Sequence, residues 1–369
     1  MKPKAYHPAL DGLRAICILM VMYSHLSASS QVPRFIRAST LGPSAVVVFF
    51  VLSGFLITLQ LQSELRSTNG IRLGRFYIRR FFRLVPAMLL MVATACIFFK
   101  LGLVALSKRD IWNALTYTMD YVKPDTWTLA HLWSLSVEEQ FYLLWPVVLL
   151  FAGLKRAPKV VFWVIVLSPI LRLVCWYDAV SEELIVRRFE LVADGLAFGC
   201  LLTLEQERFR NLNLWKRVTP NKVVLLGGAV IVVCSGIVRF YPRFEIIGDS
   251  LIGLAAMLLI ASISFFPFEK STLFLSSRQL VWLGRISYSL YLWQQLFLLP
   301  TPDRSSLFVP FPANVVCAIA AACASYYFIE SPLRELGKKL TQSDTKFTFY
   351  SIAYDGIARL RRKRLVRAG

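Results

Sequence analysis

A histidine inside an apolar stretch is the first candidate for chemistry in this sequence. Three histidines occur in the 369-residue chain, His7, His25 and His131, and His25 lies in the apolar run 15–26. A charged side chain at the centre of a membrane helix costs about 2.5–3.5 kcal/mol on insertion scales, whereas a neutral imidazole can act as a general base. A histidine that only fills a packing position is the structural alternative.

Two charged residues precede His25 on the same face of the expected helix. Arg14 lies eleven residues before His25, which returns to within about 20° of the same face, about 16 Å away along the axis. Asp11 falls on nearly the same stripe. The three side chains predict a polar seam through the membrane, unless Asp11 and Arg14 are only a salt-bridged pair that anchors the helix at the interface.

Glu138 is the second candidate, near the outer end of a span that begins at about Ser134. A carboxylate beside an imidazole can fix its tautomer and stabilise the charge that develops when it takes a proton. We therefore expect Glu138 to orient the ring of His25. Glu139 points about 100° away. His131 is a rival base, and its place in a loop favours a surface residue.

A basic cluster follows the second expected span. Arg79, Arg80 and Arg83 have a spacing that could hold phosphate groups through bidentate hydrogen bonds. Inner loops of membrane proteins are generally basic, so this cluster could equally be a topology signal.

These candidates must be positioned by membrane helices. The chain is 56% hydrophobic and 17% charged, and apolar segments of about 20 residues recur along it. We expect an all-α, polytopic integral membrane protein of about ten transmembrane helices, near residues 12–30, 43–62, 84–106, 134–152, 158–177, 189–204, 221–238, 247–267, 280–300 and 309–331. We interpret the first span as a retained helix rather than a cleaved signal peptide.

The basic charge is distributed as a topology signal. The net charge is +20, and with the N-terminus inside, most Lys and Arg residues fall in inner loops and tails. This pattern predicts cytoplasmic N- and C-termini and attraction to an anionic lipid bilayer, and it argues against nucleic acid as a partner.

Two regions are expected along the chain. Residues 1–334 form the membrane domain, and 335–369 a basic cytoplasmic tail, either an interfacial helix or a disordered segment. The seven cysteines are scattered through apolar spans without a CxxC pair, so we expect buried thiols and no metal site.

Six motifs in order resemble the acyltransferase-3 family of membrane acyltransferases. They are LDGLR at 10–14 with His25, VFFVLSGFLIT at 48–58, FYIRRFFRLVP at 76–86, WSLSVEEQFY at 133–142, GRISYSLYLW at 284–293 and FIESP at 328–332.

The resemblance implies an enzyme of the bacterial inner (plasma) membrane. Such an enzyme transfers an acyl group, usually acetyl, from cytoplasmic acyl-CoA to a hydroxyl of a sugar, polysaccharide or other glycoconjugate. The family's Arg–His pair falls on Arg14 and His25, its donor-linked arginines on Arg80 and Arg83, and its acid on Glu138. The resemblance thus points to His25, Arg14 and Glu138 for catalysis, and to Arg80 and Arg83 for donor binding. From its place on the polar seam we expect Arg14 to bind the donor as well, by guiding its pantetheine arm.

Two positions depart from the family pattern. Val47 stands where relatives often have Asp, and Gln294 where they tend to have His. We also expect no appended extracytoplasmic esterase-like domain in this sequence. The alternative function is a transporter or flippase of lipid-linked saccharides that uses the same polar seam.

Overall fold

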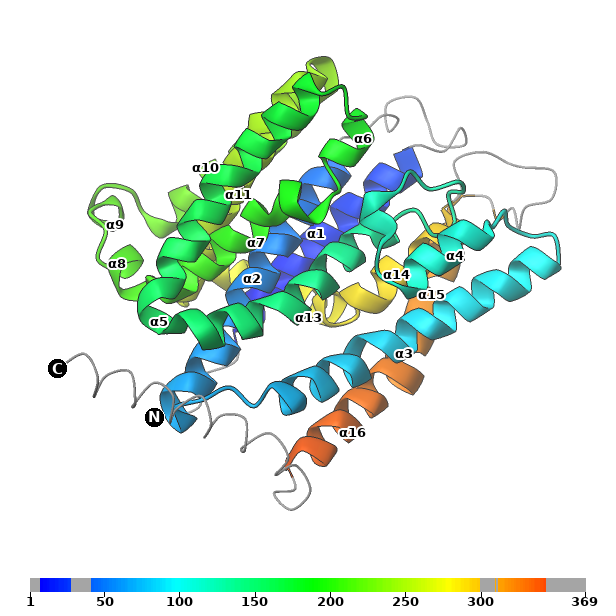
Figure 1. Cartoon of the computed structure of the whole chain (residues 1–369), viewed down its shortest axis with the longest axis horizontal. Helices are drawn as coiled ribbons and strands as arrows, with labels where there is room; N and C mark the ends of the chain where they lie inside the picture. The colour runs from blue at the N-terminus through cyan, green and yellow to red at the C-terminus, as the bar shows by residue number, and fades with distance from the viewer. Residues whose placement is uncertain (1–6, 28–40, 299–308, 310, 343–369) are drawn as a thin grey trace, which may run out of the picture.

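The computed structural model of the chain is mainly helical in the part it describes (Figure 1). That part comprises residues 7–27, 41–298, 309 and 311–342, and no strand occurs in it. The all-α prediction is confirmed. The helices are α1 Pro8–Ser27, α2 Leu41–Thr68, α3 Leu73–Lys100, α4 Lys108–Leu115, η2 Met119–Tyr121, α5 Leu132–Tyr177, α6 Glu182–Ile185, α7 Phe189–Leu204, α8 Gln206–Arg210, α9 Leu214–Arg217, α10 Pro220–Phe240, η3 Pro242–Phe244, α11 Glu245–Phe265, α12 Lys270–Leu275, α13 Arg278–Arg285, α14 Ser287–Phe297, α15 Ala313–Ser325, η4 Tyr326–Glu330 and α16 Ser331–Gln342.

Among the described residues, seven helices are long and apolar enough to cross a membrane, counting α15 to α16 as one. Within the described residues, each of the ten predicted spans coincides for most of its length with a helix, with half of one, or with helices in succession. Residues 28–30, 299–300 and 310 of these spans lie outside the described residues. Two predicted spans share α5, which bends at Gly153, where φ is +67°. Glycine adopts this left-handed conformation without a Cβ penalty. Two other spans fall on shorter pieces, the 16-residue α7 and the α13–α14 pair.

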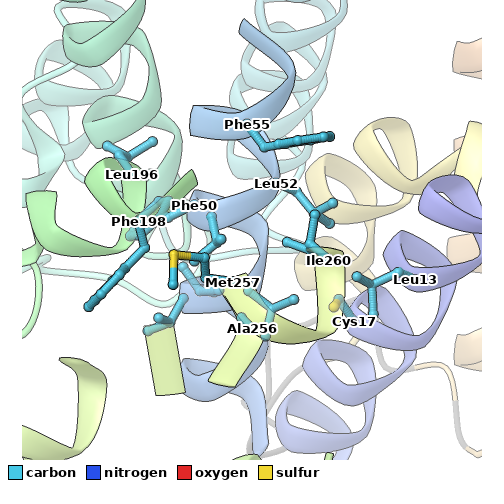
Figure 2. Packing of buried hydrophobic residues seen from close by; sticks show 14 of the residues in the cluster. Leu13, Cys17, Phe50, Leu52, Phe55, Leu196, Phe198, Ala256, Met257 and Ile260 are labelled. Carbon is cyan, nitrogen blue, oxygen red and sulfur yellow. The ribbon is translucent and has the colours of Figure 1, made fainter. Parts of the chain in front are cut away.

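The buried centre of the molecule is formed by α1, α2, α7 and α11. Figure 2 shows Leu13 and Cys17 of α1 near Ile260 of α11, with Phe50 of α2 and Phe198 of α7 in the same cluster. By contrast, α3, α5 and α10 expose many large apolar side chains. An apolar exterior around an apolar core is what a lipid-embedded bundle requires.

The backbones of α2 and α7 lie in direct contact. A Cβ on Gly199 would lie 2.0 Å from the carbonyl oxygen of Val51, and one on Gly54 would lie 2.0 Å from that of Leu196. Gly195 and Gly199 form a G-x-x-x-G motif, which permits close helix approach in membranes. This crossing fixes the relative positions of Phe50 on α2 and of the α7 residues beside it.

The last described helices form one long rod with a π-helical turn, η4, between α15 and α16. Pro332 follows this turn and has no N–H to donate to the preceding turn, so a local change of hydrogen-bond register is expected there. The rod packs against α3 (Figure 1). Helix α16 continues past the predicted boundary at 334 to Gln342, and the remainder of the predicted tail, 343–369, lies outside the described residues.

Candidate active site

Two cavities contain the predicted site residues. The larger, of about 700 Å³, is lined by Arg14, Arg80 and Arg83, and we call it the arginine cavity. The smaller, of about 360 Å³, is lined by His25 and His131, and we call it the histidine cavity. Both volumes are typical of small-molecule sites. The cavities have three lining residues in common, Val46, Phe50 and Tyr291, so they are neighbours across a shared wall.

The three predicted donor-binding arginines meet in the arginine cavity, although they come from two helices. Arg14 on α1 pairs with Asp11 at 2.9 Å, as the salt-bridge interpretation expected. The guanidinium of Arg80 on α3 lies over the rings of Tyr142, 5.0 Å from its centroid, and Phe76, at 5.5 Å. These aromatic faces hold the guanidinium through cation–π attraction.

Sequence reasoning missed three further basic residues of this cavity. Arg285 lies at the end of α13, and Arg334 and Lys338 lie on α16. The spacing of four residues from Glu330 through Arg334 to Lys338 places these side chains on one helix face, a signal that could have identified them. Glu330 is itself buried and accepts a hydrogen bond from Ser289 at 2.9 Å.

The arginine cavity carries an excess of positive charge. Of the described residues that line it, six are basic and three are acidic. The buried Nε atoms of Arg83 and Arg334 have no hydrogen-bond partner within the described part of the chain. Unpaired buried donors are costly, because they have lost water without gaining a partner. An anionic ligand with several oxygen acceptors would complement this cavity.

Glu138 belongs to the arginine cavity rather than to the immediate surroundings of His25. Its carboxylate accepts hydrogen bonds from Ser53 at 2.7 Å and from Tyr142 at 3.0 Å. The Glu138 carboxylate thereby holds the side chain of Tyr142, over whose ring the Arg80 guanidinium lies. The expected pairing of Glu138 with His25 is not among the contacts of the described residues.

Gln294 is the partner of the His25 ring. The Oε1 atom of this fully buried glutamine lies 2.9 Å from His25 Nδ1. Because a carbonyl oxygen only accepts hydrogen bonds, Nδ1 carries the proton and Nε2 keeps its lone pair. The ring of Trp127 packs edge-on against the imidazole, with 5.3 Å between the ring centroids. Gln294 and Val47 are the two departures from the family pattern. Gln294 thus contacts the candidate base His25, and Val47 lines the histidine cavity.

His131 is not a surface residue, so that interpretation is wrong. Its side chain is 3% exposed, because the segment before α5 is covered by α14. His131 Nε2 lies 3.2 Å from the carbonyl oxygen of Leu292. Burial lowers the pKa of His131 to about 3, with a smaller contribution from nearby His25. The imidazole is therefore neutral at ordinary pH.

A buried ion pair supports one side of the histidine cavity. Arg172 on α5 binds Asp194 on α7 at 2.7 Å, and Asp194 lines the cavity. The Arg172 guanidinium also donates to the Ile246 and Leu191 carbonyl oxygens and to Ser250. Sequence reasoning did not single out this pair. No group of three His, Cys, Asp or Glu side chains with metal-binding geometry occurs in the described ranges.

Comparisons with known proteins identify the family of this chain. Residues 7–330 match the family described as "Acyltransferase domain" (acyltransferase-3). The chain is 31% identical to O-acetyltransferase OatA of Staphylococcus aureus, over 90% of this chain and 58% of the relative. It is 29% identical to peptidoglycan O-acetyltransferase OatA of Listeria monocytogenes, over 90% and 57% respectively.

The chain therefore spans a little over half the length of these curated relatives. No solved structure matches it. The family match covers nearly all of the described helices and all six motifs begin within it. The protein is a membrane protein that belongs to the acyltransferase-3 family.

Proposed function

We propose that this protein is a membrane O-acyltransferase of a bacterial plasma membrane. It moves an acyl group, acetyl in the simplest case, from cytoplasmic acyl-CoA to a hydroxyl of a surface sugar, polysaccharide or other glycoconjugate. The N- and C-termini are cytoplasmic in this scheme. The relatives' printed names, which specify O-acetyl transfer and, for one of them, peptidoglycan, support the choice of acyl group and acceptor class.

One observation carries the proposal. The histidine cavity with His25 and the arginine cavity share the wall formed by Val46, Phe50 and Tyr291. A donor held by its phosphates in one cavity would therefore need only a narrow passage to bring its thioester to the imidazole in the other.

The donor's charge fits the arginine cavity. Coenzyme A carries several phosphate groups, and guanidinium groups bind phosphate through strong, charge-assisted hydrogen bonds. In our proposal Arg80 and Arg83 hold these phosphates. Arg14 lies on the helix that carries His25, and it guides the pantetheine arm toward the shared wall.

The chemical step is general-base catalysis by His25. Its Nε2 lone pair takes the proton of the acceptor hydroxyl as the oxygen attacks the thioester carbonyl. A C–O bond forms and the C–S bond breaks, and the proton passes to the leaving thiolate to give free CoA. Gln294 keeps the proton on Nδ1 throughout.

Glu138 acts from the donor side in this proposal. Its hydrogen bonds to Ser53 and Tyr142 fix the wall against which the Arg80 guanidinium lies. Glu138 thus keeps its predicted importance for transfer, while the orientation of the His25 ring is assigned to Gln294.

The test measures free CoA thiol. Purified protein in nanodiscs receives acetyl-CoA and soluble peptidoglycan fragments, and thiol release is followed together with the mass of the acetylated product. We expect His25→Ala and Arg14→Ala to abolish transfer. The matched control is Arg66→Ala, an exposed arginine of α2 that does not line either cavity, and it should keep wild-type activity.

Full activity in purified His25→Ala would refute the general-base mechanism. Wild-type protein that consumes no thioester, but moves a lipid-linked saccharide across the bilayer, would instead support the transporter alternative.

A further inference from the structure

The tautomer of His131 is fixed by its hydrogen bond. The Leu292 carbonyl oxygen can only accept, so His131 Nε2 carries the proton and Nδ1 keeps a lone pair. That Nδ1 atom is buried and has no hydrogen-bond partner among the described residues. His131 lines the histidine cavity together with His25. The cavity therefore contains two imidazoles, each with one ring nitrogen held by a neighbour and the other available as an acceptor.

The rest of the histidine cavity combines flat aromatic walls with acidic side chains and one arginine, Arg187. Trp127 and Trp133 line it, as do Asp249 and Glu245 of α11. Aromatic faces suit the apolar faces of a sugar ring, and carboxyl oxygens accept hydrogen bonds from hydroxyl groups. Few places in a membrane bundle offer this mixture, because buried acids and bases are costly there.

We propose that the histidine cavity is the acceptor site and that it selects a polyol. The hydroxyl that becomes acylated donates its proton to His25, and a second hydroxyl of the same acceptor donates a hydrogen bond to His131 Nδ1. A hydroxyl has one hydrogen, so two acceptor nitrogens require two donor groups on the ligand. This inference rests on the proposed function, and it adds the residue that recognises a second hydroxyl of the acceptor.

His131 is suited to recognition rather than to proton transfer. Burial lowers its pKa to about 3, so it stays neutral throughout the pH range in which enzymes of this kind work and accepts a hydrogen bond without taking the proton. Its Nε2 atom is already held by the Leu292 carbonyl oxygen, so the ring does not need to reorient when the acceptor binds.

The test compares His131→Gln with wild-type protein. The Gln Nε2 atom can replace the ring Nε2 as donor to the Leu292 carbonyl oxygen, whereas the Nδ1 acceptor is lost. With acetyl-CoA and a soluble peptidoglycan disaccharide, we expect the KM for the disaccharide to rise about tenfold or more, because a buried hydrogen bond is lost. The KM for acetyl-CoA and the pH profile of kcat should stay unchanged.

A deoxy acceptor separates recognition from a structural effect. In disaccharide analogues, the hydroxyls next to the acylated one are replaced by hydrogen, one at a time. For one of these analogues, the KM should be equally high with wild-type protein and with His131→Gln. An unchanged disaccharide KM in His131→Gln, or the same penalty for every analogue, would overturn the inference. Failure of the proposed function is distinct, because wild-type protein would then release no thiol with any acceptor.

Discussion

At the scale of single residues, the two buried histidines differ in what holds them. His25 Nδ1 binds a glutamine side chain, and His131 Nε2 binds a backbone carbonyl. The free lone pair is therefore on Nε2 in His25 and on Nδ1 in His131. A hydrogen-bond partner decides the tautomer of a neutral imidazole, and the tautomer decides which atom can accept a proton or a hydrogen bond. The chemistry of each ring thus depends on one neighbour contributed by α14.

The low pKa of His131 predicts how folding stability depends on pH. In the folded protein this pKa is about 3, against 6.5 for an unperturbed histidine. Between these values the unfolded chain binds one more proton than the folded chain, so the free energy of unfolding falls as the pH is lowered from about 7 to about 4. The contribution is at most about 1.4 kcal/mol per pH unit.

His131→Gln removes this contribution. We expect its free energy of unfolding to depend less steeply on pH than that of wild type, as measured by thermal unfolding in nanodiscs between pH 7 and pH 4. Other carboxylates titrate in both proteins, so only the difference between the two curves is informative. Parallel curves would contradict the assignment of a neutral, buried His131.

At the scale of helices, the crossing of α2 and α7 determines where the histidine cavity forms. Phe50 of α2 and Asp194 of α7 both line that cavity. Their helices approach closely enough that a Cβ on Gly199 would lie 2.0 Å from Val51 O and 2.5 Å from Phe55 N. Such contacts cannot be relieved by a side-chain rotation, because both atoms belong to the backbone.

Gly199→Ala should therefore destabilise the fold by about 1–3 kcal/mol, the usual range for overpacking, and should lower acyl transfer because the cavity wall moves. The measurement is the midpoint of thermal unfolding, together with thiol release. Gly228→Ala on α10 is the control, since a Cβ there has nothing within 4 Å. Its stability should be equal to or above that of wild type. Equal effects of both substitutions would argue against the tight crossing.

At the scale of the whole molecule, hydropathy and motif order predicted most of the architecture. The apolar segments located the helices because a backbone in lipid must satisfy its own hydrogen bonds. Hydropathy also separated the two halves of α5, since the predicted spans 134–152 and 158–177 lie on either side of the bend at Gly153. It did not report the division between α13 and α14, which falls inside the single predicted span 280–300.

The candidate site was predicted only in part, because some of its contacts join residues far apart in the sequence. Arg14, Arg80, Arg83 and Glu138 do share one cavity. The position of His131 was misjudged, because burial of a loop residue depends on a helix about 160 residues away in the sequence. The pairing of His25 with Gln294 joins residues 269 positions apart. Contacts of this kind are set by tertiary packing, and one sequence contains no local signal for them.

The charge of the arginine cavity makes a final prediction at this scale. Six basic residues against three acidic ones, among those described at its lining, create a field that attracts a polyanionic donor. Arg334→Gln removes one of these charges, and we expect the KM for acetyl-CoA to rise about tenfold, the worth of one charge-assisted hydrogen bond. The dependence of that KM on salt should also weaken, since fewer charges are screened. Lys339→Gln, on the same helix but outside the cavity, is the matched control and should leave both unchanged. If the two variants raise the KM equally, the attraction comes from the basic surface in general, and the donor is not held in this cavity.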